Sequence, residues 1–433
     1  MKANYTILLF LMLIACQLTS AQNTDNQYIE LINAQDYLTL SRRYETGKDS
    51  LQSEVTKLMT EAFTKAALNK SNESNEAVGI LLNSHQEELG LNGITALIVL
   101  MTDNMKRLGN YKESADVLQS FLDQTASFNG LDSLTRKGLE KLTYWGALGN
   151  GVIPEIIRPK RDCEISFFYG KDKFRNHAYI NAELNGKTVS FILDTGADAY
   201  DTNTVTEGFA RKNGIRIMKD SVVINGTAEG YAKLGFADSM KIGDIVYKNV
   251  SFTVTPGDNL LPVDSIFLDA ILGSVFLKAM KEIQIFPNEK KVVFPYEESE
   301  LPSGGANMTL IGGQPYVEAF SSGERLLLHF DTGGGIGLSS KYYMKHKDQI
   351  EAIGKLDSTG GVGGFGAMKR MNKYILPSFS LQVGSEKREI KDMVVLADID
   401  FSHRVGDGAI GFDFVQLFNK TTINYNKMFL KFE

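Results

Sequence analysis

The spacing of apolar residues divides the chain into two regions. From residue 22 to residue 150 apolar positions recur every three or four residues, as in amphipathic helices, and proline is absent. The segment Gly149–Arg161 contains two prolines and interrupts this pattern, and the residues after it alternate apolar and polar as half-buried strands do. The pattern predicts a multidomain α plus all-β protein, with a helical domain at 22–150 followed by a β-rich region.

A second break, the acidic segment Glu297–Asn307, separates two β-rich halves with similar sequences. We call residues 165–296 the first half and residues 308–433 the second half. An apolar run leads into Asp-Thr-Gly at Asp194 in the first half and at Asp331 in the second. An apolar-Gly motif then follows 79 and 80 residues after these aspartates (273 − 194 and 411 − 331). This internal duplication predicts one fold used twice.

The first 21 residues have the features of a secretory signal peptide. Lys2 is followed by a short apolar run and by small residues that end at Ala21. Leu13–Cys16 also resembles a lipobox, in which Cys16 would carry a lipid anchor, although the pattern favours cleavage after Ala21. No later stretch reaches the ~20 apolar residues of a transmembrane segment. We therefore expect an exported protein, periplasmic or extracellular, with a membrane-anchored lipoprotein as the alternative.

Charge and motif content argue against several classes of function. The net charge is −6 and the basic residues are scattered, so nucleic acid is not an expected partner. The five histidines lack the spacing of a zinc site, and no Gly-x-Ser-x-Gly motif occurs. The glycine run at 360–366 lacks the Gly-Lys-Ser/Thr ending of a phosphate-binding loop. We expect no metal ion and no cofactor.

The paired Asp-Thr-Gly motifs resemble those of pepsin/retropepsin-like aspartic peptidases, in a form with two fused retropepsin-like lobes. The resemblance covers residues 165–433 and implies two pseudo-symmetric β-barrel-like lobes, at 165–296 and 308–433, with a protein or peptide substrate. It also implies that Asp194 and Asp331 face each other as the catalytic pair. Two carboxylates in contact cannot both ionise, so they share a proton and together supply a base and an acid. A water molecule between them would then attack the peptide carbonyl.

The resemblance assigns roles to further residues near each aspartate. The threonines would hydrogen-bond across the interface between the lobes, and the glycines would leave room for a tight turn. A glycine-bearing hairpin after each aspartate would form a flap over the substrate. The active-site loops are then Thr195, Gly196 and Ala197, and Thr332, Gly333 and Gly334. The flap candidates are Gly226, Gly230 and Tyr231 in the first half, and Gly361, Gly364 and Phe365 in the second.

Three alternatives remain open at the level of sequence. The chain could be a catalytically weak or inactive peptide-binding protein of the cell envelope. Each half could pair with its counterpart in a second chain, although the short linker between the halves favours pairing within one chain. The helical domain could recruit a protein partner, because Leu108–Leu122 resembles one helical hairpin of a tetratricopeptide-type (TPR-like) repeat.

Overall fold

The computed structural model describes residues 23–433 except 128–129, 171–176, 198–200, 226–228, 261–266, 360, 365–366 and 399–404. The predicted signal peptide and Cys16 lie outside the described residues. The chain divides into two compact units, of which one comprises residues 1–153 with Thr309–Gly312 and the other comprises Pro154–Met308 with Gly313–Glu433. Within the part that is described, none of the helices combines the length and the apolar character that crossing a membrane requires.

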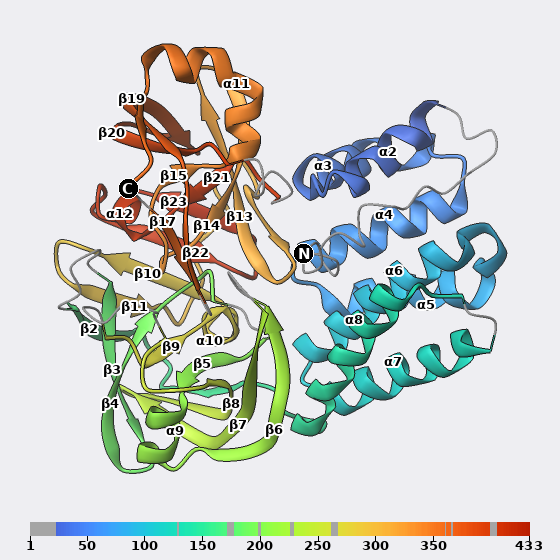
Figure 1. Ribbon diagram of the computed structural model, residues 1–433, viewed down its shortest axis with the longest axis horizontal. Helices are drawn as coiled ribbons and strands as arrows, with labels where there is room; N and C mark the ends of the chain where they lie inside the picture. The colour runs from blue at the N-terminus through green and yellow to red at the C-terminus, as the bar shows by residue number, and fades with distance from the viewer. Residues whose placement is uncertain are drawn as a thin grey trace. The chain divides into compact units, whose positions relative to one another are not determined.

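The N-terminal unit is built from helices that bury one apolar face each (blue to teal in Figure 1). Helix α7, for example, buries Leu118 and Leu122. Polar side chains cap three of the described helices of this unit, since Asp36, Ser53 and Asp132 accept hydrogen bonds from the first turns of α3, α4 and α8, respectively. The helices are α2 (Asn23–Asn33), α3 (Tyr37–Gly47), η2 (Lys48–Ser50), α4 (Glu54–Ala67), α5 (Ser71–Ser84), α6 (Gln86–Arg107), α7 (Tyr111–Ala126), α8 (Ser133–Thr143) and η3 (Tyr144–Leu148).

The segment Leu108–Leu122 is not the helical hairpin that its sequence suggests. It consists of the turn before α7 and most of α7, which is a single helix. Gly109, with φ of 76°, makes the turn after α6. A TPR-like repeat thus stays a prediction, and it has no support from this segment.

The second unit is largely β and contains the strands of both halves except most of β12 (Met308–Ile311), whose residues 309–311 belong to the first unit (green to red in Figure 1). Its short helices are α9 (Glu207–Asn213), α10 (Ser274–Ala279), α11 (Ser340–Ile353) and α12 (Phe412–Val415). The strands up to residue 296 are β1 (Glu155–Ile157), β2 (Cys163–Tyr169), β3 (Ala178–Leu184), β4 (Lys187–Leu193), β5 (Asn203–Thr206), β6 (Arg216–Asn225), β7 (Glu229–Ile242), β8 (Ile245–Thr255), β9 (Ala270–Leu272), β10 (Glu282–Phe286) and β11 (Lys291–Phe294). The strands of the second half are β12 (Met308–Ile311), β13 (Gln314–Ser321), β14 (Glu324–Phe330), β15 (Gly337–Leu338), β16 (Lys355–Asp357), β17 (Gly361–Gly364), β18 (Ala367–Arg370), β19 (Lys373–Val383), β20 (Glu386–Leu396), β21 (Gly408–Ile410), β22 (Thr421–Asn424) and β23 (Phe429–Phe432).

The strands that lead to the two aspartates pair in the same order in each half. In the first half, β3 and β4 form an antiparallel hairpin, β4 runs parallel to β9, β9 pairs with β5, and β5 runs parallel to β8. In the second half, β13 and β14 form the hairpin, β14 runs parallel to β21, β21 pairs with β15, and β15 runs parallel to β20. The repeated sequence therefore encodes a repeated order of strand pairings.

Turn glycines and one shared sheet complete this frame. Gly243 ends β7 with φ of 57° and Gly384 ends β19 with φ of 58°, a conformation that favours glycine. Strand β10 of the first half pairs with β22 of the second, with Ile283 opposite Ile423. The predicted fold class is confirmed at the level of a helical N-terminal region followed by a largely β region with barrel-like sheets.

Candidate active site

Each predicted catalytic aspartate lies directly after the second strand of its hairpin. Asp194 follows β4, and its backbone N–H donates to the carbonyl oxygen of Leu272 at 3.1 Å. Asp331 follows β14, and its backbone N–H donates to the carbonyl oxygen of Ile410 at 2.9 Å. The parallel neighbour, β9 or β21, therefore fixes the backbone of each aspartate in the same way.

The structure brings the two aspartates together. The backbone N–H of Gly333 donates to Oδ1 of Asp194 at 3.2 Å and to Oδ1 of Asp331 at 3.0 Å. Oδ1 of Asp194 also accepts from the N–H groups of Gly196 at 2.9 Å and Ala197 at 3.1 Å. Because one N–H contacts both carboxylates, their oxygens must lie close to each other.

The surroundings of the pair favour a shared proton. Burial raises the pKa of Asp194 well above its usual value, and the neighbouring charge of Asp331 and a hydrogen bond to its side chain raise it further. The N–H groups of Gly196 and Ala197 oppose this shift, because they stabilise the ionised carboxylate. The pair is therefore suited to hold one proton and one negative charge.

The two threonines join the loops by reciprocal hydrogen bonds. Oγ1 of Thr195 donates to the carbonyl oxygen of Phe330 at 2.7 Å and accepts from the N–H of Thr332 at 2.9 Å. Oγ1 of Thr332 donates to the carbonyl oxygen of Leu193 at 2.8 Å and accepts from the N–H of Thr195 at 3.0 Å. Both side chains are buried, so these bonds are shielded from water.

Glycine is required where each loop passes the carboxylate of the other half. A Cβ atom at Gly196 would collide with the carboxylate of Asp331, and one at Gly333 would collide with that of Asp194. The glycines of the two apolar-Gly motifs have a similar role. A Cβ atom at Gly273 or Gly411 would collide with the carbonyl oxygen of Ala197 or Gly334, respectively. Gly273 and Gly411, which follow the aspartates by 79 and 80 residues, thus allow each active-site loop to pass close to their backbone.

One residue that orders the second loop was missed by the motif comparison. The Asp413 carboxylate accepts from the backbone N–H of Ile336 at 3.1 and 3.0 Å, just beyond the glycines of this loop. The corresponding position in the first half is Val275, so the duplication itself concealed the role of Asp413.

The flap candidates lie on hairpins as far as they are described. Strands β6 and β7 pair with Ile224 opposite Gly230 and Val223 opposite Tyr231, whose side chain is exposed. Strands β17 and β18 pair with Gly361 opposite Arg370 and Gly364 opposite Ala367. Gly226 and Phe365 lie outside the described residues. A flap function of these hairpins stays a prediction.

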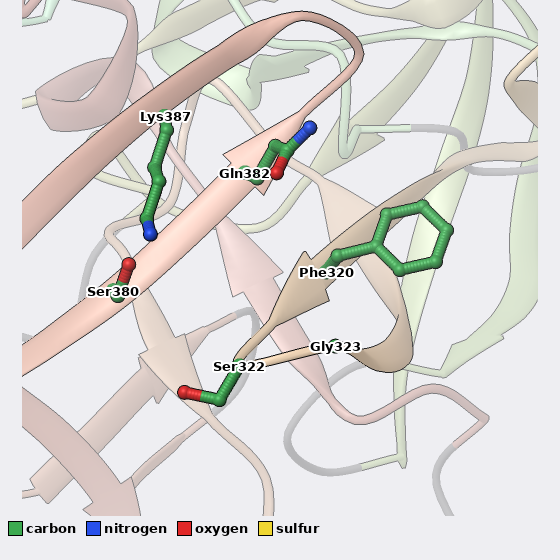
Figure 2. Close-up of a pocket in the computed structure, with 6 residues that line it drawn as sticks. All are labelled: Phe320, Ser322, Gly323, Ser380, Gln382 and Lys387. Atoms are coloured by element: carbon green, nitrogen blue, oxygen red, sulfur yellow. The ribbon is translucent and has the colours of Figure 1, made fainter.

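Other features of the described part of the chain do not compete with this site. Among the residues that the structure places, no group of three or more His, Cys, Asp or Glu side chains could hold a metal ion. A hollow of about 350 Å³ lies in the second half between β19, β20 and the turn after β13 (Figure 2). It contains no predicted site residue and is lined by Phe320, Ser322, Gly323, Ser380, Gln382 and Lys387.

Comparison with known proteins connects this geometry with one family. Residues 180–279 match the family model described as "gag-polyprotein putative aspartyl protease". No curated protein sequence matches the chain significantly.

Solved structures give weak likenesses. A retropepsin-like aspartic protease from Rickettsia conorii is 21% identical and covers 32% of this chain and 90% of its own, with a TM-score of 0.21. Basic 7S globulin from soybean is 11% identical, and the match covers 64% of this chain and 95% of the globulin, with a TM-score of 0.40. Conglutin gamma, a basic 7S globulin from lupine seeds, is 10% identical, and the match covers 61% of this chain and 92% of conglutin gamma, with a TM-score of 0.38. Because every TM-score is below 0.5, these likenesses carry no weight for function.

Proposed function

We propose that this chain is an aspartic endopeptidase, because residues 180–279 match the family model described as "gag-polyprotein putative aspartyl protease". It hydrolyses peptide bonds with a water molecule activated between Asp194 and Asp331. The observation that carries the proposal is the N–H of Gly333, which donates to both carboxylates. A structural role in two separate turns would not require the aspartates to meet.

The chemistry follows from the shared proton. The ionised carboxylate takes a proton from the water as the water oxygen attacks the peptide carbonyl carbon. The protonated carboxyl donates a hydrogen bond to the carbonyl oxygen, where negative charge develops. Transfer of a proton to the amide nitrogen then breaks the C–N bond. The raised pKa of Asp194 supports this division of roles, because it keeps one proton on the pair above the usual range of a carboxyl.

We also propose that residues 165–296 and 308–433 form two pseudo-symmetric lobes around this pair. The repeated order of strand pairings and the reciprocal hydrogen bonds of Thr195 and Thr332 support this assignment. In it, the loops Thr195–Ala197 and Thr332–Gly334 hold the carboxylates. The β6–β7 and β17–β18 hairpins act as flaps over an extended peptide.

Two further parts of the proposal concern the cellular location of the protein and the role of its helical domain. We expect export to the periplasm or the extracellular space through the signal peptide at 1–21, with a lipid anchor at Cys16 as the alternative route. The helical domain at 22–150 would bind a protein partner. These assignments rest on sequence pattern, and mass spectrometry of the mature N-terminus tests the processing route.

Digestion of a mixed peptide library from acidic to neutral pH tests the peptidase activity. The parent protein is compared with Asp194→Asn and Asp331→Asn, which keep an oxygen for the surrounding N–H groups but cannot share a proton. The matched control is Asp116→Asn, which removes an exposed carboxylate on α7. We expect cleavage by the parent and the control alone. Peptide binding without cleavage in all four proteins would favour a peptide-binding protein instead.

A further inference from the structure

Two side chains at equivalent positions lie beside the aspartate pair, and neither belongs to the Asp-Thr-Gly motifs. His177 and Gln314 each precede the aspartate of their own half by 17 positions (194 − 177 and 331 − 314). The hairpins have the same register, because Tyr179 pairs with Ile192 and Tyr316 pairs with His329. His177, the residue just before β3, therefore occupies the position equivalent to Gln314, the first residue of β13.

Each of these side chains reaches the active-site loop of the other half. Nε2 of Gln314 donates to the carbonyl oxygen of Gly196 at 2.7 Å. Nε2 of His177 lies 3.2 Å from the carbonyl oxygen of Gly333. A carbonyl oxygen can only accept, so Nε2 of His177 carries the hydrogen. All four groups are half-buried, whereas the threonine hydroxyls lie deeper.

The bond from Gln314 acts on a group that contacts a catalytic carboxylate. The carbonyl of Gly196 and the N–H of Ala197 belong to one peptide unit, which is planar. That N–H donates to Oδ1 of Asp194 at 3.1 Å. Holding the carbonyl thus fixes the direction of the N–H toward Asp194. In the other loop, His177 contacts the carbonyl of Gly333, which shares a peptide unit with the N–H of Gly334. This N–H donates to the backbone oxygen of Asp331 at 2.9 Å.

We propose that Gln314 and His177 are positioning residues for the aspartate pair, and that Gln314 acts through the Gly196–Ala197 peptide on Asp194. The proposal rests on the proposed peptidase function. At each of the two positions this role requires one side-chain N–H donor long enough to reach the loop carbonyl. An amide and an imidazole both supply such a donor. The two bonds therefore act on different groups. The bond from Gln314 orients an N–H that donates to the Asp194 carboxylate, whereas the bond from His177 orients an N–H that donates to a backbone oxygen within a turn.

Kinetics of paired variants test this role. Gln314→Met keeps the length of the side chain without a donor, whereas Gln314→His and His177→Gln restore a donor. We expect Gln314→Met to lower kcat/KM about tenfold, since the N–H that it releases donates to a charged group. The acid limb of its pH profile should move to higher pH, because the ionised form of Asp194 loses a stabilising donor. Gln314→His and His177→Gln should stay within about threefold of the parent.

Gln382→Met is the matched control, since it removes another glutamine that donates to a glycine carbonyl, that of Gly384 at 3.0 Å. Gln382 lines the hollow with Phe320 and Lys387 (Figure 2). This variant should leave kcat/KM and the acid limb unchanged. Thermal unfolding shows whether each variant is folded. If Gln314→Met does not fold, Gln314→His still decides, because a loss of tenfold or more in this folded variant would overturn the proposal.

A measurement without turnover separates this proposal from the peptidase assignment. The carboxyls of the pair are titrated by NMR of protein labelled with ¹³C-aspartate, in the parent and in Gln314→Met. We expect the lower apparent pKa of the pair to rise in the variant. Cleavage by the parent with no change in titration would overturn the positioning role. A changed titration without cleavage by the parent would overturn the peptidase assignment alone.

Discussion

At the scale of the residue, the aspartate pair can hold a shared proton, but burying its charge lowers the stability of the fold. Burial and the neighbouring carboxyl raise the pKa of Asp194. The folded protein therefore binds this proton more tightly than the unfolded chain does. The free energy of unfolding must fall as pH rises from the unfolded pKa, about 3.9, through the raised folded value. Above that window the folded state carries the full cost of the buried charge.

Asp194→Asn should consequently stabilise the protein at neutral pH while it abolishes cleavage. The amide is uncharged, and its oxygen can still accept from Gly196 and Ala197. We expect Tm at pH 7 to rise by about 2–4 °C, the shift that roughly 1 kcal/mol produces in a domain of this size. Scanning calorimetry at several pH values measures it. The gain should vanish below pH ~3.9, where the parent carboxyl is also neutral, and a gain independent of pH would contradict this account.

At the scale of the element, the two active-site loops stabilise each other. Thr195 and Thr332 exchange hydrogen bonds with the backbone of the opposite half and are buried. Loss of one hydroxyl leaves a buried carbonyl and a buried N–H without that partner. Such groups are costly because no water replaces the lost bond.

Thr195→Val and Thr332→Val should each lower the free energy of unfolding by about 2–3 kcal/mol, since each removes two buried hydrogen bonds. The double variant should cost less than the sum of the two, because the threonines belong to one network. Urea unfolding of the four proteins completes the cycle, and Thr195→Ser is the control that retains the hydroxyl. Additive losses would show that the two halves are stabilised independently.

Asp413→Ala should free the loop beyond the glycines of the second half. The Asp413 carboxylate accepts from the N–H of Ile336, and alanine removes this acceptor. Asp413 is exposed, so we expect a loss of stability of only about 0.5–1 kcal/mol. Hydrogen exchange at the Ile336 amide should accelerate severalfold. Asp413→Asn keeps an acceptor oxygen and should retain most of the protection, and equal exchange in both variants would rule out this role of the carboxylate.

The sequence could predict those elements whose signal is local. The apolar runs before Asp194 and Asp331 appear as strands β4 and β14, where they are expected. Contacts between segments far apart in the chain leave no local pattern. Asp413 could not be recognised because its counterpart is valine. His177 and Gln314 differ from each other, so a comparison of the halves by identity passes over them, although equal spacing to the aspartates would have found both.

At the scale of the whole β-rich unit, the halves are interleaved. Strand β10 of the first half pairs with β22 of the second. Thr195 of the first loop donates to the carbonyl oxygen of Phe330, and the N–H of Gly333 in the second loop donates to the carboxylate of Asp194. This arrangement supports one aspartate pair within each chain. A dimer in which each half pairs with its counterpart would contain two separate pairs.

Loss of either aspartate should therefore abolish activity in a monomer. We expect Asp194→Asn and Asp331→Asn each to lower kcat at least a hundredfold, because the pair acts as a unit. Specific activity of the parent should not depend on enzyme concentration, as measured by dilution together with light scattering. If each half paired with its counterpart in a second chain, either variant would retain about half of the activity, since the other site would stay intact.

Under the proposed peptidase function, the unlike pair His177 and Gln314 has a consequence for the direction in which a peptide lies. A peptide runs from amine to carboxylate, so its two ends present different groups to the two sides of a cleft. A site made from two identical chains must offer the same side chains to both ends. Here the two positions are encoded separately, and a histidine faces one loop while a glutamine faces the other. Selection can adjust the two sides independently, and the site can then favour one polarity of the bound peptide.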